Sequence, residues 1–154
     1  MSKWFNKNVT CENGSAAVEF GLILPVLLLL FSGLTEYGRA YFQANAIEKG
    51  LRAATIYASR ASTPLSAADA VIAENILKTG TADGTGPLLV SGWGKPGAGI
   101  SITSTNFDLE GTLIPVIKIE ASVPFDPIIP GLATMVGLGG MIISLSHEQP
   151  YVGK

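Results

Sequence analysis

Hydrophobic residues are concentrated in one long run near the N-terminus of the chain. Between Ala16 and Leu34 lie 19 residues, and Glu19 is the one ionisable residue among them. About 20 apolar residues in a helix span the hydrocarbon core of a bilayer, and a proline such as Pro25 is tolerated there. We therefore expect a membrane-spanning helix that the protein retains.

A cleaved secretory signal peptide is the alternative interpretation of this run. Such a peptide places basic residues directly before its apolar segment and a small-residue cleavage site directly after it. Here Lys3 and Lys7 lie more than ten positions before Phe20, and no Ala-X-Ala site directly follows Leu34. The pattern favours a retained helix, and the basic residues before it indicate a cytoplasmic N-terminus.

The helix is predicted to start at Ser15 and to continue beyond the membrane to about Ala61. In its second part, apolar and small residues recur in alternating steps of three and four, which is the spacing of one helix face. These residues are Tyr37, Ala40, Ala44, Ile47, Leu51, Ala54, Ala58 and Ala61. Because most of them are small, the face suits close packing. A short helix is then expected between an N-cap at Ser66 and a stop at Gly80.

From residue 87 onwards the hydrophobic period changes to two, the period of a β-strand. The predicted strands are Leu88–Ser91, Gly99–Thr105, Val116–Val123 and Met141–His147. The third of these has one apolar and one polar face, which is typical of a half-buried antiparallel strand. We therefore predict an α+β fold, in which a long N-terminal transmembrane helix continues into a small domain made of a helix and an antiparallel sheet.

A second apolar stretch lies between Asp126 and Glu148, where 21 residues include no Asp, Glu, Lys or Arg. Pro130 and several glycines interrupt it, and these residue types disfavour a continuous helix. We interpret the stretch as an apolar loop that leads into the last strand. A second membrane span is the alternative.

Composition narrows the classes of function. Charged residues make up 14% of the chain, and the net charge of −2 lacks the basic excess of a nucleic-acid-binding protein. Cys11 is the single cysteine, so an intramolecular disulfide and a cysteine-cluster metal site are excluded. We interpret Cys11 as a leader residue, with lipidation as the alternative, and the single histidine, His147, as a surface residue. The chain is therefore predicted to have no catalytic residue, no metal and no cofactor, and not to be an enzyme.

Two local patterns receive structural interpretations. Gly92–Gly97 fits the G-x-G-x-x-G pattern of dinucleotide sites, but that motif must open a helix, and here an alternating segment follows. We expect a hairpin loop instead. Glu36 and Arg39 are three residues apart, and we interpret them as an ion pair on the helix surface at the membrane edge.

Glu19 is the unusual residue of the N-terminal run. An ionisable side chain in such a segment costs about 2.5–3.5 kcal/mol on insertion scales, so we expect it to have a partner or a function. The alternative is a carboxylate that reaches the membrane surface, because Glu19 lies only four residues beyond Ser15.

The segment Gly14-Ser-Ala-Ala-Val-Glu-Phe resembles the processing site of type IV pilin-like proteins, in which a glycine precedes an apolar helix with glutamate at its fifth residue. Counted from Ser15, Glu19 is the fifth. The continuation to Leu30 and the following Glu36-Tyr-Gly-Arg-Ala-Tyr are similar to the TadE-like family, the minor pilins (pseudopilins) of Tad (Flp) tight-adherence pilus systems.

The resemblance implies an organisation of the chain. Residues 1–14 would form a cytoplasmic leader, 15–36 the transmembrane helix, 37–61 its extension and 62–154 a periplasmic α+β head. A prepilin peptidase would process the chain between Gly14 and Ser15. Glu19 would then pair with the N-terminal amine of a neighbouring pilin during assembly.

The resemblance also implies a function and a set of partners. The chain would be a minor pilin in the assembly of a Tad-type adhesive pilus, crossing the bacterial inner membrane once and able to enter the extracellular pilus. Its partners would be the prepilin peptidase, other pilins, the pilus assembly platform and the lipid bilayer, with no nucleic acid. The first alternative is an uncleaved single-pass protein that scaffolds the pilus secretion machinery. The second is a membrane-anchored hydrolase or binding domain, for which no nucleophile–histidine–carboxylate set is recognisable.

Overall fold

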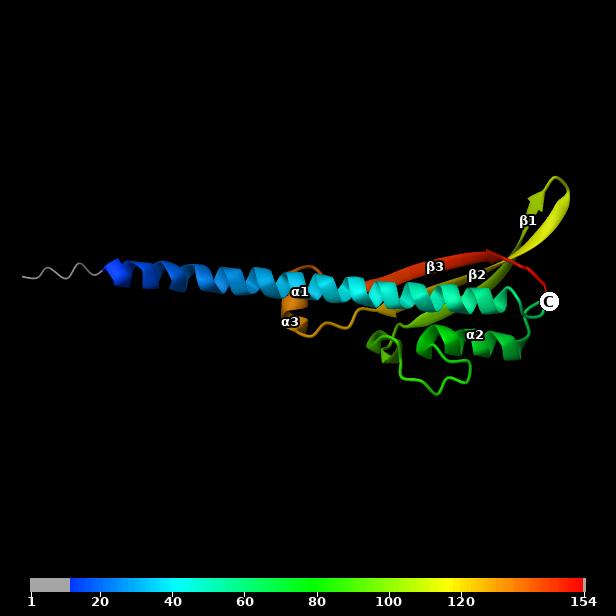
Figure 1. Ribbon diagram of the computed structural model, residues 1–154, viewed down its shortest axis with the longest axis horizontal. Helices are drawn as coiled ribbons and strands as arrows, with labels where there is room; N and C mark the ends of the chain where they lie inside the picture. The colour runs from blue at the N-terminus through cyan, green and yellow to red at the C-terminus, as the bar shows by residue number, and fades with distance from the viewer. Residues whose placement is uncertain (1–11, 154) are drawn as a thin grey trace, which may run out of the picture.

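One long helix carries a small head along its C-terminal half in the computed structural model, which describes residues 12–153 (Figure 1). The elements are α1 (Glu12–Ala58), α2 (Ala67–Thr79), the 3₁₀ turn η1 (Ser91–Gly94), β1 (Gly99–Leu109), β2 (Thr112–Pro124), α3 (Pro130–Met135) and β3 (Ile142–Pro150). The long apolar helix followed by a small helix and an antiparallel sheet confirms the predicted α+β fold.

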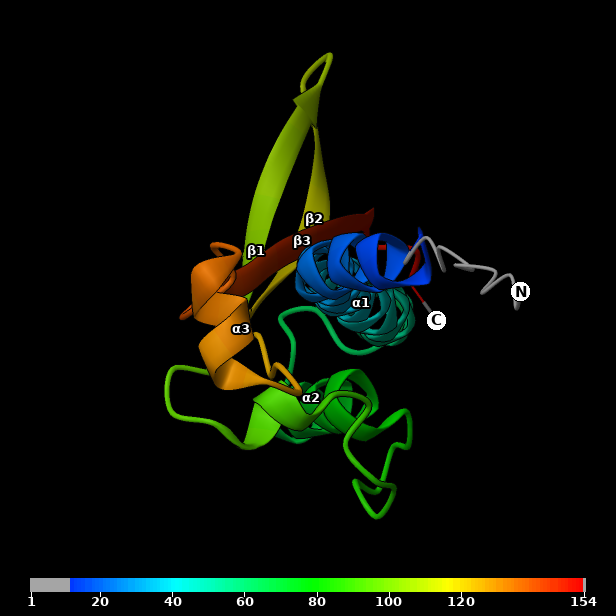
Figure 2. The same ribbon diagram turned by 90° about the vertical axis from the view of Figure 1, so that its left-hand side faces the viewer.

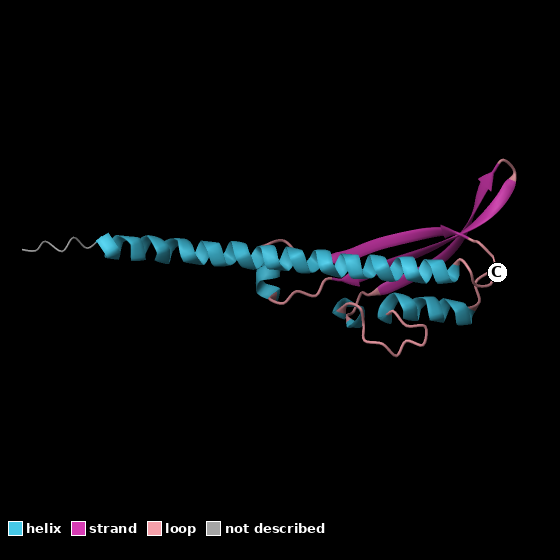
Figure 3. Cartoon of the chain, in the orientation of Figure 1, coloured by secondary structure: helices cyan, strands magenta, loops and turns pink. Residues whose placement is uncertain are grey.

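The three strands form one antiparallel sheet in the order β1-β2-β3 (Figure 3). In the central strand, Ile119 lies opposite Ile102 of β1 and opposite His147 of β3. The apolar face of β2 is buried, as its alternating pattern predicts. Its buried residues are Ile117, Ile119, Ala121 and Val123.

Strands β1 and β2 extend beyond β3 as a two-stranded hairpin, because β3 pairs with β2 only from Val116 to Pro124. The turn residues Glu110 and Gly111 have φ angles of 51° and 87°. Positive φ at both central residues matches the twist of the two strands. The hairpin lies at the end of the head opposite to α3 (Figure 1).

The core forms where the C-terminal half of α1 lies between α2 and the sheet (Figure 2). The predicted face of α1 is buried at Ala40, Ile47, Leu51, Ala54 and Ala58, and Ala61 just beyond the helix is buried as well, whereas Tyr37 is exposed. Small residues allow a close approach to α2. A Cβ on Gly50 would lie 2.8 Å from the carbonyl oxygen of Leu77, which is closer than real Cβ atoms come.

Helix α2 begins and ends where the sequence predicts. The Ser66 hydroxyl accepts a hydrogen bond from the Asp69 amide at 3.1 Å, and Gly80 has a left-handed φ of 77°. Helix α1, by contrast, starts three residues before the predicted Ser15 and ends three before the predicted Ala61. Its last turn tightens, because the Ala61 amide bonds to the carbonyl of Ala58 at 3.2 Å.

The predicted strand Leu88–Ser91 is wrong. The Leu89 amide donates to the carbonyl of Lys78 at 2.8 Å, which ties this segment to the end of α2 and not to the sheet. Residues 92–97 are consequently not a hairpin loop, since η1 and a turn lead from there into β1. Gly92 is required at this turn, because a Cβ would collide with the carbonyl oxygen of Pro124.

The apolar stretch after Asp126 folds as loops around the short helix α3. With six residues, α3 is about 9 Å long, far less than the roughly 30 Å of a bilayer core. Within residues 12–153, only α1 is long and apolar enough to cross a membrane. The stretch is therefore a loop with a helical turn, and a second span there is excluded by its fold.

Candidate functional site

The N-terminal part of α1 extends away from the head and is exposed at every residue from Gly14 to Phe31 (Figure 1). Its large side chains are apolar on all sides of the helix, which is typical of a helix surrounded by lipid. Residues 14–33 span about 30 Å, the thickness of a bilayer core. Pro25 lies inside this part without ending the helix. The geometry therefore matches a candidate membrane span.

Gly14, Ser15 and Glu19 lie together at the free end of α1. The Ser15 hydroxyl donates to Oε1 of Glu19 at 3.5 Å, across one turn of the helix. A Cβ on Gly14 would meet nothing within 4 Å. In residues 12–153, the Glu19 carboxylate has no charged partner.

The peptide bond between Gly14 and Ser15 lies in the first turn of α1, because the helix begins at Glu12. The first four amides of a helix have no intrahelical acceptor, so this turn is the easiest one to open. Most of the predicted leader, including Cys11, lies outside the described residues.

Glu36 is the polar residue that sequence reasoning misread. It is 2% exposed, and its Oε1 accepts hydrogen bonds from the amides of Ile128 at 3.0 Å and Ile129 at 2.8 Å. These two amides precede α3. Glu36 therefore fixes the loop before α3 to the point where α1 enters the head.

Three further residues of α1 hold the same loop. Arg39 Nε donates to the carbonyl oxygen of Asp126 at 2.8 Å, and Gln43 Nε2 donates to the same oxygen at 3.1 Å. The Tyr37 hydroxyl donates to the carbonyl of Val136 at 2.9 Å, beyond α3. The predicted ion pair between Glu36 and Arg39 is wrong, because each side chain bonds to loop backbone instead.

The side chain of Asp126 adds a charged contact to this junction. It forms an ion pair with Lys95, which follows η1. The Lys95 ammonium, and after it a hydrogen bond from the Ser91 hydroxyl, lower the pKa of Asp126 below its usual value. The loop before α3 is thus joined to α1 through its backbone and to the segment after η1 through its side chain.

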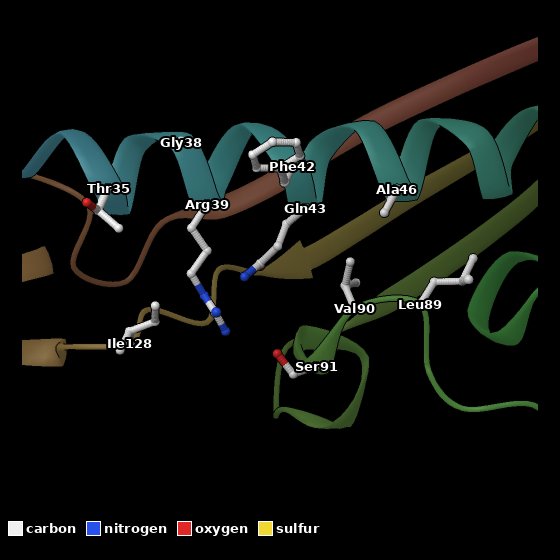
Figure 4. Close-up of a pocket in the computed structure, with 10 residues that line it drawn as sticks. All are labelled: Thr35, Gly38, Arg39, Phe42, Gln43, Ala46, Leu89, Val90, Ser91 and Ile128. Atoms are coloured by element: carbon white, nitrogen blue, oxygen red, sulfur yellow. The ribbon is translucent and has the colours of Figure 1, made fainter.

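A groove of about 590 Å³ runs beside this junction. It is lined by α1 between Thr35 and Ala46, by residues 89–91 and by Ile128, and Figure 4 shows Arg39 and Gln43 pointing from α1 towards its far wall. The lining is mostly apolar, and it holds no pair of residues suited to acid–base or nucleophilic chemistry.

The remaining candidate residues do not form a site with these. His147 lies on β3 opposite Ile119 of β2, far along the chain from Glu19. Across residues 12–153, no group of three His, Cys, Asp or Glu side chains is placed to hold a metal ion. The features that stand out are the exposed end of α1 and the junction between α1 and α3.

A comparison with protein families finds one match. Residues 14–55 match the family described as TadE-like protein. The match covers the exposed part of α1, the junction residues of α1 and most of its packed part, which confirms the resemblance seen in the sequence. No curated protein and no solved structure matches the chain.

Proposed function

Since residues 14–55 match the TadE-like family, which suggests a protein associated with a Tad pilus, we propose that the chain is a minor pilin (pseudopilin) in the assembly of that pilus. Helix α1 would cross the inner membrane, with its N-terminus in the cytoplasm and the head in the periplasm. Glu19 carries the proposal. It is the one ionisable residue in the exposed apolar part of α1, and no charged group in the described chain neutralises it.

Processing by a prepilin peptidase between Gly14 and Ser15 is part of this function. The bond lies in the first turn of α1, and glycine costs about 1 kcal/mol relative to alanine inside a helix. Opening the turn to the extended conformation that a protease binds is therefore inexpensive. Open space around the Gly14 Cα leaves the bond accessible from the side of the helix.

Cleavage would give Glu19 a partner of opposite charge. The new amine of Ser15 would lie at the start of the apolar helix, where an unpaired charge is costly, and Glu19 carries the same cost. Pairing the Glu19 carboxylate of one subunit with the amine of the next lowers both costs at once. Assembly of pilins side by side in the membrane then depends on this residue.

An uncleaved membrane anchor that scaffolds the secretion machinery is the competing function. The observation in its favour is that α1 runs through Gly14 to Glu12 without a break. The two functions differ in what Glu19 does, because an anchor needs no charge there.

Replacement of Glu19 tests the proposal. In Glu19→Ala we expect normal or higher membrane levels, because a polar group leaves the lipid, but a loss of surface pili because the partner amine is left unpaired. Glu19→Gln should fail in the same way, since it keeps the shape and loses the charge. Immunoblots of membranes and counts of surface pili measure the two effects.

The matched control is Val18→Ala, which shortens the neighbouring exposed side chain and leaves the charge in place. It should retain pili. Normal piliation in cells with stable Glu19→Ala protein would reject the pilin function in favour of the anchor.

A further inference from the structure

Exposed apolar side chains surround α3 at the point where α1 enters the head. We call Ile128, Ile129 and Met135 the α3 patch; their side chains are 61%, 51% and 74% exposed. The patch is held against α1, because a Cβ on Gly33 would lie 3.3 Å from the Val136 side chain and Tyr37 bonds to the Val136 carbonyl.

The α3 patch lies at the level where the membrane should end. If the span starts at Gly14, about 30 Å of hydrocarbon core ends near Gly33, the residue that packs on Val136. Figure 1 shows α3 as the part of the head nearest to the free part of α1. The patch therefore continues the apolar surface of the span at its outer end.

The chemistry of the segment suits a partly apolar surrounding. The 21 residues between Asp126 and Glu148 include no acidic residue, lysine or arginine. Several of its amides also have acceptors within the protein: Ile128 and Ile129 bond to Glu36, and Ala133, Val136 and Leu138 bond to carbonyls of the α3 turn. Satisfied backbone groups reduce the cost of leaving water.

The tip of the β1–β2 hairpin shows that exposure alone does not make such a surface. Leu113 is 62% exposed, as much as Ile128, and Phe107 is 59% exposed. These residues lie beside Asp108 and Glu110, at the opposite end of the head. The hairpin tip therefore serves as an internal control.

We propose that the α3 patch inserts into the headgroup–acyl boundary of the bilayer that α1 crosses, on the side of the head. The partner is the lipid surface itself. Ile128, Ile129 and Met135 bury in the boundary, while Glu36, Arg39 and Gln43 hold their loop to α1, so the head rests on the membrane in a fixed orientation. This inference depends on α1 spanning the membrane but not on a role in a pilus.

A fluorescent probe at single cysteines tests the inference on the full-length protein. In a Cys11→Ser background, the variants Met135→Cys, Leu113→Cys and Leu24→Cys are labelled with the polarity-sensitive dye NBD and reconstituted in phosphatidylcholine–phosphatidylglycerol vesicles. Lipids with a nitroxide near the top of the acyl chain then quench any probe at the headgroup–acyl boundary. Intrinsic fluorescence of the buried Trp93 checks that each head is folded.

We expect NBD at residue 135 to emit at shorter wavelength than at residue 113, and to lose about half or more of its intensity to the nitroxide, as for groups that bury 5–10 Å below the surface. NBD at residue 113 should keep its intensity. Equal quenching at 135 and 113 would overturn the inference. So would shielding at 135 that disappears on dilution into excess unlabelled lipid, because a second protein copy would then cover the patch.

Residue 24 separates this inference from the proposed function. Val26 and Leu27 beside it are exposed apolar residues of the free part of α1, so NBD at residue 24 should be quenched most by a nitroxide deep in the acyl chain. Quenching at 24 without quenching at 135 rejects the α3 inference alone. No quenching at 24 rejects the membrane span itself, and with it both proposals.

Discussion

The two parts of α1 form one continuous helix but have opposite surroundings. From Gly14 to Phe31 every residue is exposed, and the apolar side chains cover all sides. From Gly33 to Ala58, buried residues recur on one face, and small ones such as Ala54 and Ala58 allow α2 and the sheet to approach. Hydrophobicity alone is therefore ambiguous, and its distribution around the helix distinguishes a lipid-facing segment from a core-facing one.

The largest contrast should come from shortening one leucine in each part of α1. Leu51 is 1% exposed in the core, so Leu51→Ala should lower the free energy of unfolding of the head by about 2–5 kcal/mol. Leu28 is 57% exposed, so Leu28→Ala should leave the head's stability unchanged. Urea unfolding in detergent, followed by Trp93 fluorescence, measures both. A similar loss in the two variants would show that the parts of α1 are not separate environments.

The boundary between the two parts is tested by Glu36. Glu36→Ala leaves the amides of Ile128 and Ile129 without their acceptor, which should cost about 2–3 kcal/mol of unfolding free energy. The control is Glu48→Ala on the same helix, where an exposed pair with Arg52 is lost at a cost of about 0.5 kcal/mol or less. Equal values from the same unfolding assay would mean that the junction does not hold the loop.

A smaller effect is expected from pH at the same junction. The folded pKa of Asp126 is lowered, chiefly by Lys95, so its contribution to stability is present above its ordinary pKa of about 3.9 and is lost as the pH falls through the folded value. Wild type should exceed Asp126→Asn by less than about 1 kcal/mol at pH 7, because the pair is partly exposed.

The difference between these two proteins isolates Asp126 from Asp69 and Asp83, whose pKa values are also lowered by hydrogen bonds. It should shrink as the pH falls below about 4. A difference that stays constant with pH would contradict the assignment to the ionised carboxylate.

Features with local causes could be predicted from the sequence. Ser66 and Gly80 mark the ends of α2 through the chemistry of caps, which needs only neighbouring residues. The alternation in β2 identified its buried face because both flanking layers are apolar. The exposed part of α1 was recognisable from length and composition alone.

Features that depend on distant partners could not be predicted. Glu36 bonds to amides 92 and 93 residues away, so its spacing from Arg39 gave a plausible but wrong pairing. The segment Leu88–Ser91 has strand-like residues, but its amide partner is the end of α2. The processing assignment of Gly14, Ser15 and Glu19 came from resemblance, and it stays a prediction.

The first residue of the chain recovered from its native membrane tests the central claim most directly. N-terminal sequencing should give Ser15 in cells that contain the peptidase. Gly14→Leu should block the cut because a side chain enters a pocket suited to bare backbone, whereas Gly21→Leu on the same exposed part of α1 should leave it intact. A chain that begins at Met1 in all three proteins would contradict the account and leave an uncleaved membrane anchor.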